Sequence, residues 1–251
     1  RLTDFLNLRG SISTGFRAPS MQQLYFNNIS TQFLVNSDNE LTAEQVGTFR
    51  NDSLLAQRIG IAPLKEEQSK NFSFGAVFDF SEQVSLTIDY YAIDINDRIV
   101  ISNKLCPEDS IVLAEAMANA KVDKAQVYIN GVDTQTRGID IISSWQHSLF
   151  SGQHSLTLAA NVTDTDVVKL NSPQNSELQH LTIDQVFAKQ DISIIERWQP
   201  KDRVSLSSLY QQDSWSLNIA VNRFGKYSIM DGESQTYGAK TLTDVRFEQH
   251  L

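Results

Sequence analysis

Asn71-Phe72-Ser73-Phe74-Gly75-Ala76-Val77-Phe78-Asp79-Phe80 is the stretch of sequence that decides the fold. Apolar and polar residues alternate along it with a period of two, except at Val77, and this period gives a β-strand one apolar and one polar face. A short turn over 81–83 leads into a second alternating stretch over 84–91. The pattern therefore predicts an antiparallel hairpin.

The same alternation recurs in six further segments, so we expect an all-β fold of about eight antiparallel, amphipathic strands. These segments are 6–17, 138–146, 155–162, 204–210, 215–222 and 241–248.

The connections between these segments alternate in length. Short turns are predicted at 81–83, 150–153 and 212–214, and long segments at 20–66, 102–134 and 171–202, with a shorter one at 226–236. Short turns at one end and long loops at the other are typical of a transmembrane β-barrel, whereas loops of this length argue against a compact soluble domain. We therefore expect the long segments to lie outside the cell.

Two of the long segments carry helix-forming sequence. A helix is predicted from Pro107 to Ala120, because a proline and two acidic residues open an Ala- and Leu-rich run. A single helical turn is expected over 20–25, after Pro19.

A soluble β-sandwich that binds a carbohydrate or a protein is the alternative, because alternation alone does not say whether the apolar face meets lipid or a second sheet. Apolar tracts of about nine to eleven residues match a tilted strand that crosses a bilayer. Aromatic residues are also expected near strand ends, as at a membrane interface. These are Phe16, Phe80, Tyr90, Trp145, Tyr210 and Trp215.

Composition argues against several other classes of protein. The net charge of −9 does not fit a nucleic-acid-binding protein. The single cysteine, Cys106, excludes an internal disulfide and a cysteine-based metal site, and the four histidines show no ligand spacing, so neither a metal nor a cofactor is expected. Asp89, Asp94, Asp97 and Asp140 lack a partner histidine or nucleophile, so no enzyme is predicted.

Gly15-Phe16-Arg17-Ala18-Pro19-Ser20, followed by Leu24-Tyr25, resembles a motif of the TonB-dependent outer-membrane receptors. Three further motifs of that family follow in order. They are Leu64–Asn71, with Glu66 where proline is usual; Asp89-Tyr90-Tyr91 with Ile95–Ile99; and Asn130–Asp140, which contains Thr136, Gly138 and Asp140, the last in place of the frequent glutamate.

This resemblance implies a barrel of about 22 strands with an N-terminal plug, in the bacterial outer membrane. Residues 1–251 would then be part of the barrel domain, without the plug and the final strands. The implied partners are the TonB complex, through the missing N-terminal region, outer-membrane lipid, and a scarce ligand. A ferric siderophore is expected first, before haem, cobalamin or an oligosaccharide. An isolated set of strands has open edges, so we expect it to close on itself or to self-associate.

Candidate ligand-binding residues are Arg17, Tyr25, Phe26 and Trp198. Arg17, at the end of a strand, could contact an anionic siderophore, or it could pair with a carboxylate of the neighbouring strand. Tyr25, Phe26, Phe33, Phe49, Phe187 and Trp198 could form an aromatic cage for the ligand, or they could anchor the long loops. Gly138 is expected to permit close packing or a bulge, and Pro19 to end its strand, because it has no N–H to donate.

Overall fold

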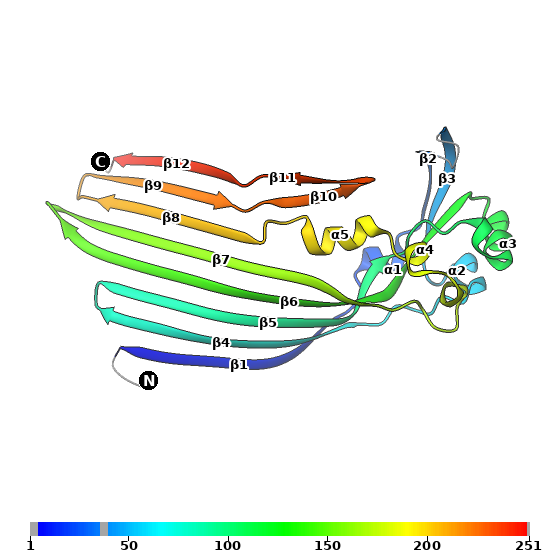
Figure 1. Cartoon of the computed structure of the whole chain (residues 1–251), viewed down its shortest axis with the longest axis horizontal. Helices are drawn as coiled ribbons and strands as arrows, with labels where there is room; N and C mark the ends of the chain where they lie inside the picture. The colour runs from blue at the N-terminus through cyan, green and yellow to red at the C-terminus, as the bar shows by residue number, and fades with distance from the viewer. Residues whose placement is uncertain (1–4, 36–39, 250–251) are drawn as a thin grey trace.

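The computed structural model describes residues 5–35 and 40–249. Its main part is one long sheet of antiparallel neighbours, and the long loops gather at one end of it (Figure 1). Eight strands follow one another in the order β1-β4-β5-β6-β7-β8-β9-β12. Their bounds are β1 Leu6–Arg17, β4 Glu67–Ser81, β5 Val84–Ile101, β6 Lys124–Leu149, β7 Gly152–Leu170, β8 Asp202–Gln211, β9 Trp215–Phe224 and β12 Lys240–Gln249.

These strands confirm the eight segments predicted from alternation. The short turns fall between β4 and β5, β6 and β7, and β8 and β9, as expected. Three strands are longer than a bilayer crossing requires, however, because β5, β6 and β7 have 18, 26 and 19 residues and a transmembrane strand needs about 9–11. If the sheet crosses a bilayer, part of β5, β6 and β7 extends beyond it, whereas β8, β9 and β12, with 10 residues each, match the crossing length.

The predicted loops contain more strand than expected. The segment 20–66 includes a hairpin of β2 (Asn28–Val35) and β3 (Leu41–Phe49), and 226–236 includes most of a hairpin of β10 (Tyr227–Asp231) and β11 (Glu233–Tyr237). The loop predicted over 102–134 is wrong from residue 124 onward, where β6 begins and β3 pairs with it in parallel. The loop hairpins and the start of β6 are held by backbone pairing, which needs no regular alternation of apolar and polar side chains.

The predicted helices are confirmed with one change. Ser20 caps α1 (Met21–Tyr25) in a capping box with Gln23. The second helix begins later than predicted, because Ser110 caps α3 (Ile111–Ala120) and a separate 3₁₀ turn, η1 (Pro107–Asp109), precedes it. The remaining helices are α2 (Leu54–Arg58), η2 (Glu177–His180), α4 (Ile183–Val186) and α5 (Lys189–Arg197).

The sheet has one exposed apolar face. Directly opposed residues point to the same side of a sheet, and the register pairs Ile12 with Phe72, Phe74 with Tyr90, and Ile139 with Val162. Ile12 is 83 % exposed. Within residues 5–35 and 40–249 no second sheet covers this face, so the β-sandwich alternative is wrong. The sheet is also open, with β1 and β12 at its two edges, so it does not close on itself.

The buried apolar core lies among the loops and not along the sheet. It packs the long ends of the strands against α2, α3 and the segment around α4 (Figure 1). Leu105, Leu113 and Val127 are fully buried in it, and Val132 joins it from β6. The loops therefore form a packed cap, which holds the loop end of the sheet in a fixed shape.

Aromatic side chains form a row on the apolar face at the short-turn end. Trp145 stacks on His147, which meets His154 edge-on at 4.9 Å between ring centroids, and Trp215 contacts both Tyr210 and Phe247. Such a row is typical of a membrane–water interface. Among the aromatic residues expected at strand ends, the prediction for Tyr90 was wrong, because β5 continues to Ile101 and Tyr90 lies in the middle of it.

Candidate functional site

The polar face carries a series of contacts between neighbouring strands, and Arg17 makes the first. Its guanidinium donates two hydrogen bonds to the carboxylate of Glu67 across β1 and β4, at 2.8 and 2.6 Å. Glu67 is 5 % exposed and also accepts from the backbone N–H of Ile99 at 2.8 Å. Arg17 thus pairs with a carboxylate of the neighbouring strand, which was the second of the two roles expected for it.

A second set of contacts lies farther down the same face. Arg9 pairs with Asp89 above Gly75, where a Cβ atom would collide with the carboxylate. Asn161 donates to Asp140 at 2.5 Å, which joins β7 to β6.

Gly138 has a steric role on this face. The ring of Tyr91 lies where a Cβ atom of Gly138 would stand. The prediction that Gly138 permits close packing is confirmed.

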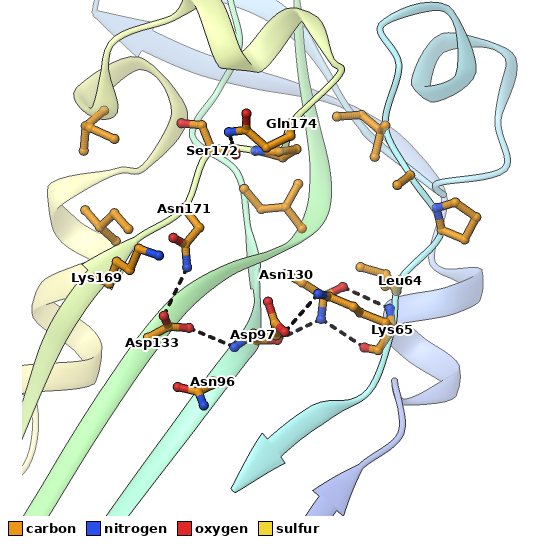
Figure 2. A pocket seen from close by; sticks show the side chains of 17 residues that line it. Leu64, Lys65, Asn96, Asp97, Asn130, Asp133, Lys169, Asn171, Ser172 and Gln174 are labelled. Carbon is orange, nitrogen blue, oxygen red and sulfur yellow. Dashed lines mark hydrogen bonds and ion pairs between the residues drawn. The ribbon is translucent and has the colours of Figure 1, made fainter.

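The loop end of the sheet is joined by Lys65, Asp97 and Asn130, from three different motif segments (Figure 2). The Asn130 amide donates to the backbone carbonyls of Lys65 and Asp97, at 3.0 and 2.8 Å, and its oxygen accepts from the N–H of Lys65 at 3.0 Å. Lys65 Nζ also lies 2.9 Å from Asp97 Oδ2. We call this group the motif junction; it ties together the segment before β4 and strands β5 and β6.

A β-bulge lies beside the motif junction. The register of β5 and β6 shifts between Ile95 and Arg98, and Asp97 has a φ of 56°, a conformation that aspartate tolerates better than most residues. Asp133 accepts from the N–H of Asp97 at 2.9 Å and from the amide of Asn171 at 3.2 Å. The bulge therefore links β5 and β6 to the loop after β7.

A cavity of about 990 Å³ lies above the motif junction, between the segment before β4 and the segment after β7 (Figure 2). Its polar walls include Asn96, Lys169, Asn171 and Gln174, and Ile183 is among its apolar residues. This volume is at the upper end of the range for small-molecule sites. Sequence reasoning missed the cavity, although three of the four motifs supply residues to its walls.

The six aromatic candidates lie in different surroundings. Phe49 and Phe187 are buried in the loop core, whereas Phe33 is 68 % exposed on β2. Tyr25 lines a smaller cavity of about 320 Å³ beside α2, and Trp198 follows α5. The ring contacts found in the described part of the chain include no pair from this set. Among the described residues, the ring of Trp198 therefore makes no ring contact with Tyr25 or Phe26.

The described residues contain no group of three histidine, cysteine, aspartate or glutamate side chains that could hold a metal ion. In the same residues, no helix is both long enough and apolar enough to cross a bilayer. Burial raises the pKa of the Cys106 thiol, so the reactive thiolate is scarce at neutral pH.

The geometry is that of a barrel wall: one apolar and one polar face, and a packed cap of loops at one end. The model of the TonB-dependent-receptor-like β-barrel family matches residues 1–248. The chain belongs to this family. Its four motifs are contact points between neighbouring strands, as Arg17–Glu67 and the motif junction show.

Solved structures of TonB-dependent receptors have the same fold. The ferric enterobactin receptor PfeA of Pseudomonas aeruginosa matches with a TM-score of 0.58 at 14% identity, over 98% of this chain and 31% of that one. The siderophore receptor PirA of Acinetobacter baumannii gives 0.57 at 13% identity, over 98% and 32%. The FrpB iron transporter of Neisseria meningitidis gives 0.56 at 12%, over 100% and 31%.

The chain spans about a third of the length of these receptors. No curated protein matches it in sequence.

Proposed function

We propose that this chain is part of the barrel wall of a bacterial outer-membrane receptor that takes up a scarce ligand, most readily an iron–siderophore complex, by TonB-coupled transport. The energy would come through the TonB complex acting on an N-terminal plug, and no chemical step is assigned to the residues of this chain. The barrel wall would contribute a fixed frame and part of the outer vestibule.

One observation carries this proposal: the sheet has an exposed apolar face on one side and, on the other, a polar face whose neighbouring strands are joined by ion pairs. An apolar face that includes Ile12, 83 % exposed, suits contact with lipid. The opposite face, with Arg9–Asp89 and Arg17–Glu67, suits a lumen that is wet or filled by a plug.

The choice of cargo is supported by the named functions of the similar structures. They include a ferric enterobactin receptor, a siderophore receptor and an iron transporter, and also a copper transporter. Their identity to this chain is 10–14%, which supports the fold and leaves the chemical class of the ligand to experiment.

Growth rescue tests the proposal. The full-length receptor is expressed in a strain that lacks its own siderophore receptors, and growth is followed in iron-limited medium with catecholate, hydroxamate and mixed siderophores, and with haem. Rescue by at least one iron complex, lost when the TonB gene is deleted, is the expected result. A receptor that reaches the outer membrane and rescues growth with none of them would contradict the iron proposal.

A further inference from the structure

Two histidines meet on the apolar face of the sheet, at its short-turn end. His147, near the end of β6, and His154, near the start of β7, stand directly opposite each other in the register. Opposed residues of neighbouring strands point to the same side of a sheet. The two ring centroids lie 4.9 Å apart, and the rings meet edge-on with 83° between their planes. Spacing along the sequence did not indicate this pair, because the hairpin register creates it.

One ring nitrogen of each histidine is buried and unpartnered. Nδ1 of His147 and Nδ1 of His154 are both shielded from solvent, and neither forms a hydrogen bond within residues 5–35 and 40–249. A buried polar atom ordinarily has a hydrogen-bond partner, and an exception calls for an explanation such as a bound ion. Two such atoms on facing side chains favour one ligand that both rings share.

The second nitrogen of His154 is held by a residue of the next strand. Its Nε2 lies 2.8 Å from the hydroxyl oxygen of Ser208 on β8. When Nε2 carries the proton and donates to this hydroxyl, Nδ1 keeps the lone pair that a metal ion needs. Metal-binding histidines almost always have their other nitrogen hydrogen-bonded in this way, which fixes the tautomer and the ring orientation. Ser208 is therefore placed to set the tautomer of His154.

The ring of His147 is held by stacking. Trp145 lies two residues before it on β6, so both side chains point to the same face. The indole stacks on the imidazole with 4.3 Å between ring centroids and 23° between the ring planes. A ring that is already held in place loses little freedom when it binds a ligand, so the pair is preorganised.

The separation of the two rings matches that of two imidazoles on one metal ion. With metal–nitrogen distances of about 2.0–2.1 Å and the angles of tetrahedral or square-planar coordination, the two ring centroids lie about 4.5–5.2 Å apart. The observed 4.9 Å falls within this range. Imidazole nitrogen suits Zn²⁺, Cu²⁺ and Ni²⁺, whereas Ca²⁺ and Mg²⁺ prefer oxygen ligands.

The pair stands close to water. His154 lies two residues after Gly152, where β7 begins, and Phe150 in the preceding turn is highly exposed. An aqueous ion can therefore approach from the side of the turn. Two protein ligands leave the remaining coordination positions of the ion to water, as in metal sites that stay open.

We propose that His147 and His154 form a two-histidine site for a late first-row transition-metal ion, which binds Cu²⁺ most tightly by the general order of divalent affinities. Ser208 is a positioning residue that acts through His154. A bound ion would join β6 to β7 beside their turn. The site lies at the end of the sheet opposite the loop cap, so the proposal does not depend on which cargo the receptor transports.

Binding is tested with the full-length receptor, without a polyhistidine tag, in phospholipid nanodiscs. CuCl₂ is titrated, and quenching of tryptophan fluorescence reports binding because Trp145 stacks on His147. His147→Gln and His154→Gln should each weaken Cu²⁺ binding by about tenfold or more, since the second imidazole of a pair acts at a high effective concentration. Excess ZnCl₂ should reverse the quenching and CaCl₂ should not. Unchanged affinity in either histidine variant would overturn the proposal.

The role of Ser208 has its own test. Ser208→Ala should weaken Cu²⁺ binding about tenfold, as for the loss of a hydrogen bond to a ligating histidine, and Ser208→Thr, which keeps the hydroxyl, should retain it. His180→Gln is the matched control, because His180 is an exposed histidine of η2 among the loops; it should bind Cu²⁺ like the unchanged receptor. Equal weakening in Ser208→Ala and Ser208→Thr would contradict the positioning role.

Electron paramagnetic resonance of the unchanged receptor, with less than one equivalent of Cu²⁺, needs no variant. Coupling to two imidazole nitrogens is expected, and coupling to one should remain in His154→Gln. Heat-dependent mobility on a gel verifies that each variant is folded. Coupling to fewer than two nitrogens in the unchanged receptor would refute the site. Metal binding as expected in a receptor that no siderophore rescues would leave this proposal intact and correct only the proposed cargo.

Discussion

Single side chains of the family motifs act on one another across strands. Asn130 forms three hydrogen bonds to the backbones of two other segments, and Arg17 forms two to Glu67. Each of these contacts fixes the position of one strand against the next. The residues of the motifs are therefore best explained by barrel construction, and a ligand role for Arg17, Tyr25, Phe26 or Trp198 stays a prediction.

Asn130→Ala should lower the free energy of unfolding by about 2 kcal/mol, because it leaves backbone groups of Lys65 and Asp97 without partners. Urea unfolding of the full-length receptor in lipid vesicles, followed by tryptophan fluorescence, measures the change. Asn119→Ala is the control, since the exposed side chain of Asn119 donates only to the backbone of Glu115 within α3. An equal, small effect of both substitutions would show that the motif junction does not stabilise the fold.

Asp191 gives a pH-dependent prediction. Burial raises its pKa, and this effect outweighs its favourable position in the first turn of α5, where a carboxylate gains from the helix dipole. A raised pKa in the folded state means that the group stabilises the fold fully below its unfolded pKa, and that this contribution is lost as pH rises through the folded pKa.

Asp191→Asn should therefore slow amide hydrogen exchange in α5 at pH 7. The difference from the unchanged protein should disappear at pH values below the ordinary pKa of aspartate. Glu115, exposed on α3, provides a comparison through Glu115→Gln, which should leave exchange in α5 unchanged. Faster exchange in Asp191→Asn at pH 7 would show that the charged carboxylate stabilises α5, which is the opposite of the expected effect.

At the scale of elements, β6 combines two environments in one strand. Its membrane part alternates between lipid and lumen, whereas residues 124–132 send Ala125, Val127, Ile129 and Val132 into the loop core. The strand is continuous because backbone pairing does not depend on what the side chains meet. The aromatic row at its other end marks where the lipid stops.

Trp215→Ala should lower the free energy of unfolding by about 1–2 kcal/mol, because it removes ring contacts to both Tyr210 and Phe247. Phe150→Ala is the matched control: Phe150 is 94 % exposed in the β6–β7 turn, and its loss should change stability by no more than about 0.5 kcal/mol. Urea midpoints in lipid vesicles measure both. A larger effect at Phe150 than at Trp215 would place the interface at the turn and not at the row.

At the scale of the whole molecule, the two ends of the sheet should lie on opposite sides of the membrane. A membrane-impermeant maleimide should label Ile111→Cys on intact cells and should label Phe150→Cys only after lysis, in a full-length receptor with Cys106→Ser. Both native residues are highly exposed, at 81 % and 94 %, so access within the protein is not limiting. Labelling of the turn variant on intact cells would reverse the orientation.

The open sheet predicts how the chain behaves alone. β1 and β12 lie at its edges, and unpaired edges pair with other chains. The 251-residue chain refolded in detergent should therefore give oligomers by light scattering. Lys substitutions at outward positions of β12, such as Val245→Lys, should reduce association. A monomer that keeps its strand content would contradict self-association through the edges.

The sequence alone determined the strands, the two faces and the short turns, because period-two alternation records directly which side chains share a face. The family was indicated by the resemblance of four ordered motifs. It also indicated the carboxylate partner of Arg17 and the packing at Gly138, which follow from neighbouring strands.

Only the tertiary structure decided the length of β6, the β2–β3 hairpin, the core of the loops and the cavity above the motif junction. Lys65, Asp97, Asn130 and Lys169 come together through the register of β4 to β7 and a bulge. A one-residue shift in such a register moves side chains to the other face, and no local pattern in the sequence records where a bulge makes that shift.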